Sequence, residues 1–233
     1  MQNKFARSST IGRTDLGFSF PDLLVVLAAL SLIAAIAVPL LIKNRARVRQ
    51  AQCMNNLNQV NRAVLLYADE SQGTLPVFSE QNKDPVWWFY KELIKGHAGL
   101  KDKSSAQDKL FACPDDRGYT DPIPFWRNSR FDFSSYVFNG VNLPGIPNLA
   151  GKKVNSVKEP TKTLLTMEWT AHGPLSWHSS RTGKKNAPFY NNAGSMCGFV
   201  DGSVKFTPIY YDGIDAAFTR DPIPGYDYRW SAE

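Results

Sequence analysis

The chain has 233 residues, with 27 lysines and arginines against 21 aspartates and glutamates, so its formal net charge is +6 at pH 7. This length predicts one domain, or one domain with an extension. The small positive excess requires no acidic partner. The sequence lacks a basic stripe with interleaved aromatic residues, which disfavours nucleic-acid binding. The three cysteines form no CxxC pair, which disfavours a zinc knuckle.

The N-terminal region predicts a membrane helix. Residues 23–42 are mostly apolar and carry no charge, and as a helix they are long enough to cross a hydrocarbon core of about 30 Å. A leader containing Lys4, Arg7 and Arg13 precedes them, and Asp22 stands at their start. Because an isolated carboxylate is costly in a membrane, Asp22 is a candidate functional residue.

Basic residues follow the apolar segment directly: Lys43, Arg45, Arg47 and Arg49. Such a group is typical of the headgroup-facing end of a membrane helix. Basic residues therefore lie on both sides of the segment, and the positive-inside rule alone does not favour a cytoplasmic N-terminus.

An ordinary secretory signal is an alternative interpretation of the same region. Residues 35–37 form an A-x-A site, and cleavage there would release a soluble protein that begins at Val38. The length of the leader and the apolar character that continues to Ile42 argue against it. An uncut signal anchor is a third alternative.

The helical pattern continues well beyond the apolar segment. Apolar residues recur at spacings of three and four: Ala51, Met54, Leu57, Val60 or Asn61, Val64, Leu65 and Ala68. One helix is therefore predicted from near Pro21 to about Asp69, with residues 71–73 ending it, for a length of about 73 Å. Pro39 lies inside this helix and is expected to kink or loosen it.

From residue 74 onward the composition is that of a soluble α+β body. A short helix is predicted to begin at Asp84-Pro85 and to end at Gly96. Strand-like segments cover residues 135–138, 163–167, 197–200 and 203–206. Asp201-Gly202 between the last two predicts a β-hairpin with a type I′ turn.

Several motifs in this order carry a resemblance to a known family. At the N-terminus they are the Gly17-Phe18 junction, Asp22 five residues into the remainder, and Pro39. Further along they are Cys53-x-Asn55-Asn56-Leu57-x-Gln59, Phe111-x-Cys113-Pro114, Ser135-Tyr136 with Asn139, Pro160 to Glu168, and Phe199-x-Asp201-Gly202. From Gly17 to about Phe206 the chain resembles type IV pilin and type II secretion pseudopilin precursors, in a subgroup with a histidine upstream of a C-terminal Asp-Gly pair.

The resemblance implies a fold, a processing step and partners. A prepilin peptidase would cut after Gly17 and methylate Phe18, and Asp22 would pair with the Phe18 ammonium of a neighbouring subunit. The implied organisation is a leader (1–17), a transmembrane assembly half of the helix (18–42), an amphipathic half (43–73) and an α+β body with a small antiparallel sheet (74–233). The protein would sit in the inner membrane as a single-pass subunit, with its body on the periplasmic side, among other pilin or pseudopilin subunits and an assembly platform.

Two positions depart from the family pattern. The tenth position before Asp201 holds Asn191 rather than histidine, and His178 is the nearest upstream candidate, which would require an insertion. The acid at the start of the span is Asp22, where the family usually has glutamate. The shorter side chain keeps the charge but moves it back by one methylene group.

The three cysteines allow three single bridges, and the sequence does not decide among them. Cys53 and Cys113 are the expected pair for an extracytoplasmic body, which leaves Cys197 over. Such a bridge closes a sixty-residue loop and would stabilise the body by about 3–4 kcal/mol. Pairing of Cys113 with His172 or His178 as nucleophile and base is the disfavoured alternative.

Other ligand sites receive little support from the sequence. Carboxylates gather at Asp115-Asp116 with Asp121, and at Asp212, Asp215, Asp221 and Asp227, but no EF-hand spacing is present. No metal site is predicted, and calcium is retained only because major pseudopilins often hold it in a C-terminal loop. Dense aromatic residues at 87–90 and 125–133 are expected in the core. The expected function is that of a structural filament subunit and not an enzyme; the alternative is a membrane-tethered or secreted periplasmic module that binds carbohydrate or peptide and does not polymerise.

Overall fold

The computed structural model describes residues 19–77, 86–119, 123–141, 143–173, 175–178, 193–211 and 220–233. The predictions for Gly17, Phe18 and Asn191 fall outside these residues, as do the expected helix start at 84–85 and the carboxylates at 121, 212 and 215. The chain divides into two units, residues 1–45 and 46–233.

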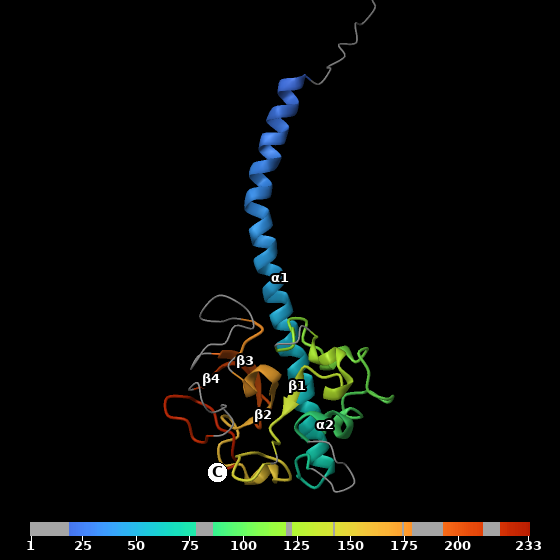
Figure 1. Cartoon of the computed structure of the whole chain (residues 1–233), viewed down its shortest axis with the longest axis vertical. Helices are drawn as coiled ribbons and strands as arrows, with labels where there is room; N and C mark the ends of the chain where they lie inside the picture. Colours follow the sequence, from blue (N-terminus) through green and yellow to red (C-terminus); the bar gives the residue numbers. More distant parts are fainter. Residues whose placement is uncertain are drawn as a thin grey trace, which may run out of the picture. The chain divides into compact units, whose positions relative to one another are not determined.

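Helix α1 runs from Phe20 to Glu70 and is continuous through Pro39 (Figure 1). Its N-terminal part is long and apolar enough to cross a membrane. Large apolar side chains there are exposed, including Leu30 at 56% and Ile33 at 63%. Such an exposed apolar surface is typical of segments that lie in lipid or pack against other apolar helices.

The later half of α1 packs on the body of the second unit through one stripe. Its buried residues are Cys53, Asn56, Leu57, Val60, Asn61, Ala63, Val64 and Ala68. The predicted stripe is confirmed from residue 57 onward, but Ala51 is exposed and Cys53 takes the buried position instead. Because the stripe is narrow, side chains on the opposite face such as Leu66 stay in solvent.

Four antiparallel strands form the sheet, in the order β1, β2, β3, β4. Their bounds are β1 Tyr136–Phe138, β2 Leu164–Glu168, β3 Ala193–Phe199 and β4 Val204–Ile209. Every residue of β1, β2 and β3 is buried. Neither face of these three strands is therefore open to solvent. The short helix α2 spans Val86–Ile94. A long helix packed on a small antiparallel sheet confirms the predicted α+β class.

The hairpin of β3 and β4 forms where it was predicted, but the predicted turn type was wrong. Gly202 has a φ of 89°, whereas Asp201 does not adopt positive φ. The Gly202 N–H donates to the Phe199 carbonyl at 3.0 Å, and the Phe199 N–H donates to the Ser203 carbonyl at 2.8 Å. These bonds define a three-residue loop that ends in a left-handed glycine, and a type I′ turn would need positive φ at both central residues.

Candidate functional site

Asp22 lies in the first turn of α1, as predicted, and forms a capping box with Ser19. The Ser19 backbone N–H donates to Asp22 Oδ2 at 3.0 Å, and the Ser19 hydroxyl donates to the same oxygen at 2.6 Å. The Asp22 N–H lies 3.4 Å from Ser19 Oγ. This arrangement satisfies free donors at the helix start while Asp22 remains exposed.

A disulfide joins Cys53 of α1 to Cys113, with a Cα–Cα distance of 4.7 Å. Cys113 follows the short 3-10 helix η1 (Lys109–Phe111), and both cysteines are fully buried. The structure therefore selects the expected pairing among the three possible ones. Cys197 on β3 is a buried free thiol, and burial together with the Glu168 carboxylate raises its pKa well above the ordinary value.

Three ionisable side chains form a buried cluster beside this disulfide. His178 Nε2 lies 2.8 Å from Glu168 Oε1, and His178 Nδ1 lies 3.2 Å from Asp115 Oδ2. The same His178 Nε2 is 3.9 Å from Cys113 Sγ. The imidazole therefore lies between two carboxylates and against the disulfide.

Charge complementarity keeps this cluster stable despite its burial. Desolvation alone would lower the pKa of His178, but the Glu168 and Asp115 carboxylates outweigh it and raise the pKa to about 9. Arg49 Nε donates to Asp115 Oδ1 at 2.8 Å, and Arg117 Nη2 lies 3.8 Å from that oxygen. The cluster thus joins α1, the segment after Cys113 and strand β2.

The sequence identified His178 and the cysteines but missed Glu168, Asp115 and Arg49 as their partners. Glu168 ends a strand of otherwise uncharged residues, where a carboxylate has to find a partner, and this was the one available signal. His172 lies elsewhere: burial lowers its pKa to about 3, and its ring packs 5.1 Å from that of Trp87. The arrangement of Cys113 with His172 as a nucleophile pair is therefore not formed.

The described carboxylates of the two predicted acidic loops are held by protein groups. Asp116 accepts hydrogen bonds from Gly118 N at 2.8 Å and Ser135 Oγ at 2.7 Å, and burial raises its pKa to about 7. Asp221 accepts from Trp230 N at 2.8 Å, and Asp227 lies 3.2 Å from Lys162 Nζ. Among the described residues, these loops do not converge on a calcium site.

The aromatic residues pack mainly on one another, as expected for a core. The rings of Phe125 and Trp169 stack at 4.7 Å, and Phe131 meets Trp169 edge-on at 4.9 Å. Trp126 is half-buried, and Lys109 Nζ and the Arg127 guanidinium lie 4.4 and 4.6 Å from its ring. The indole is therefore in contact with cations of the chain itself.

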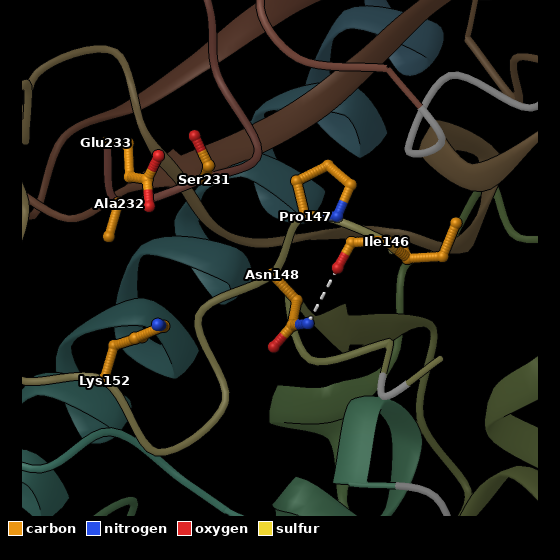
Figure 2. A pocket seen from close by; sticks show the side chains of 7 residues that line it. All are labelled: Ile146, Pro147, Asn148, Lys152, Ser231, Ala232 and Glu233. Carbon is orange, nitrogen blue, oxygen red and sulfur yellow. Dashed lines mark hydrogen bonds between the residues drawn. The ribbon is translucent and has the colours of Figure 1, made fainter. Parts of the chain in front are cut away.

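A hollow lies near the C-terminus of the described part of the chain (Figure 2). It is lined by Ile146, Pro147, Asn148, Lys152, Ser231, Ala232 and Glu233. Lys152 and Glu233, its charged residues, are both exposed, and Asn148 Nδ2 donates locally to the Ile146 carbonyl at 3.0 Å. A site for chemistry requires desolvated groups that converge, and this hollow offers none.

No family model, curated protein or solved structure matches this chain.

Proposed function

We propose that this protein is a structural subunit of a pilus-like filament, of the type II secretion pseudopilus or type IV pilus class. The observation that carries the proposal is the first half of α1, where apolar side chains are exposed on all sides and the first turn holds a single carboxylate. Such a surface is stable in lipid, and it is equally stable among identical apolar helices after assembly.

Asp22 supplies the specificity that an apolar surface lacks. After cleavage behind Gly17, the new terminus would be Phe18, four residues before Asp22. An ammonium from a neighbouring subunit can pair with the exposed Asp22 carboxylate, and in a medium of low dielectric this pairing fixes the register of the two helices. Methylation of Phe18 by the prepilin peptidase leaves that positive charge in place.

The body on the later half of α1 would face the periplasm. Disulfides persist in oxidising compartments, and the Cys53–Cys113 bridge supports placement outside the cytoplasm. Anchoring would be single-pass in the inner membrane, and the partners would be other pilin or pseudopilin subunits together with an assembly platform. The Cys113 thiol is consumed by the bridge, which supports a structural rather than an enzymatic role.

Photo-crosslinking in native membranes tests the proposal. A photo-reactive phenylalanine analogue at Leu30 should crosslink to the same protein in a ladder of multimers, whereas the analogue at Leu143, which is 58% exposed in the body, serves as the control. Asp22→Asn should abolish the Leu30 ladder and Asp22→Glu should retain it. A chain that stays monomeric at Leu30 would instead favour a tethered binding module.

A further inference from the structure

Four side chains with metal-binding atoms, the two disulfide cysteines among them, meet at one point. The sulfur atoms of Cys53 and Cys113, a carboxylate oxygen of Glu168 and a ring nitrogen of His178 all lie within 4.8 Å of one another. The two cysteines and Glu168 are fully buried, and the His178 side chain is 2% exposed. This is a closed set of two sulfur, one nitrogen and one oxygen donors.

We propose that, when a dithiol reductant opens the disulfide, these four side chains form a closed site for one thiophilic divalent cation, with zinc as the best fit. Structural zinc sites are tetrahedral and use cysteine, histidine and carboxylate ligands. Two thiolates select zinc over calcium or magnesium, which prefer oxygen. The inference goes beyond the filament function and does not depend on it.

The donor atoms lie close enough together for one ion, although the two bonded sulfur atoms have to separate after reduction. Neighbouring ligand atoms of a tetrahedral zinc site lie about 3.3–3.8 Å apart. His178 Nε2 is 3.9 Å from Cys113 Sγ and 2.8 Å from Glu168 Oε1. An ion between them therefore needs side-chain adjustment and no change of fold.

The surrounding hydrogen bonds orient the two non-sulfur ligands toward this point. His178 Nδ1 donates a hydrogen bond to Asp115 Oδ2 at 3.2 Å, and Arg49 donates one to the other oxygen of Asp115. The second carboxylate oxygen of Glu168 accepts from Met196 N at 2.9 Å. His178 Nε2 and Glu168 Oε1 are left facing the sulfur atoms, which is the outer-shell arrangement usual around zinc-bound histidine and carboxylate.

Contacts other than the disulfide hold the two cysteines near each other. The Tyr136 hydroxyl donates to the Cys53 carbonyl at 3.0 Å, and the Cys113 N–H donates to Ser135 Oγ at 2.9 Å. Asn56 of α1 donates to the Ala112 carbonyl at 2.8 Å. None of these bonds uses a sulfur atom, so reduction does not itself break them, and they hold the two thiols near each other when the S–S bond is absent.

The redox step balances as an ordinary thiol–disulfide exchange. The S–S bond takes two electrons and two protons from the dithiol, which is oxidised to its own disulfide. Cation binding then releases both thiol protons and the Nε2 proton of His178 to solvent. Since the S–S bond and the cation use the same two sulfur atoms, the disulfide and the metal exclude each other.

Cobalt titration of the full chain in detergent tests the site. The protein is reduced anaerobically with a dithiol, the dithiol is removed, the free thiols are counted, and Co²⁺ alone is added and then displaced by Zn²⁺. We expect one equivalent of Co²⁺ with the thiolate-to-cobalt charge-transfer band and the intense visible bands of tetrahedral cobalt. The oxidised chain should show neither signal.

Matched variants separate this site from adventitious thiol binding. Cys197→Ala removes the third thiol, which lies outside the ligand set, and should leave the titration unchanged. His178→Ala and Glu168→Gln should lose the tetrahedral spectrum, and both can be checked for folding while the disulfide is still intact. Asp115→Asn, which acts through His178, should bind about 10–100-fold more weakly.

Three results would overturn the proposal. One is a folded, reduced chain with free Cys53 and Cys113 thiols that gives no charge-transfer band. The second is binding of equal strength by the oxidised chain or by His178→Ala. The third is a reduced chain that unfolds and does not regain its circular dichroism when Zn²⁺ is added.

Discussion

The Asn61 side chain of α1 lies where any side chain at residue 198 of β3 would have to project. A Cβ built on Gly198 would come within 2.5 Å of Asn61 Oδ1 and 2.8 Å of Thr166 Oγ1. Asn61 Nδ2 donates to the Phe199 carbonyl at 2.9 Å, and Thr166 Oγ1 donates to Asn61 Oδ1 at 2.7 Å. Gly198 therefore allows α1 to approach the sheet closely enough for a buried polar contact.

Gly198→Ala should destabilise the body by about 2–3 kcal/mol, because the added methyl group separates α1 from β3 and strains a buried hydrogen bond. Chemical denaturation of the full chain in detergent, followed by tryptophan fluorescence, measures the change. Gly96→Ala is the control, since nothing lies within 4 Å of a Cβ at that position. Equal stability of both variants would contradict the packing argument.

Opening the Cys53–Cys113 bridge in the presence of a metal chelator should lower the free energy of unfolding by about 3–4 kcal/mol, because the reduced chain regains the entropy of a long open loop. The bridge spans 60 residues of sequence. Thermal unfolding with and without reductant measures the loss. The stability of the double variant Cys53→Ala/Cys113→Ala should not change when reductant is added. A wild-type chain that is insensitive to reductant would show that the bridge contributes no stability.

Stability of the oxidised, metal-free body should fall as the pH rises from about 6.5 to about 9. The folded pKa of His178 is raised to about 9 from an ordinary value of 6.5, so its stabilising charge is fully present below pH 6.5 and lost as the pH rises through 9. The expected loss is up to about 3 kcal/mol. Chemical denaturation across this pH range in wild type and in His178→Gln isolates the effect. If the free energy of unfolding falls with pH as steeply in the variant as in wild type, the assignment to His178 is refuted.

Lys91 should be among the most sensitive charged residues of the body. Its side chain is fully buried, with Nζ 2.9 Å from both Asp108 Oδ2 and the Asp132 carbonyl. Lys91→Met leaves the half-buried Asp108 carboxylate and the Asp132 carbonyl without their cation, and should cost about 3–5 kcal/mol. Lys162→Met is the comparison: Lys162 is 44% exposed, so solvent screens its ion pairs and this variant should lose much less stability. Similar losses in the two variants would contradict this ranking.

Local patterns explain how far the fold could be predicted. The spacing of Leu57, Val60 and Val64 fixes the packed face of α1, and Asp201-Gly202 between two apolar runs fixes the hairpin. Which cysteines pair was not decided locally, because the pairing depends on how α1 meets the segment after η1. The exact turn also escaped prediction, since only Gly202 adopts positive φ.

The buried cluster could be anticipated only in part, because it is assembled from distant segments. All of β1 and most of β2 lie between Asp115 and Glu168 in the sequence. No spacing rule relates either residue to His178. Lys91 sits within the apolar helix α2, where a lysine ordinarily faces solvent. Tertiary packing reverses that expectation by surrounding its ammonium with acceptors from other segments.

The N-terminal mass of the protein recovered from native membranes tests the central claim most directly. The filament account predicts a chain that begins at Phe18 and carries one N-methyl group. A chain that begins at Val38 would be a released soluble protein, and a chain that retains residues 1–17 would be an uncut signal anchor. Either of the latter results would contradict assembly through a processed N-terminal helix.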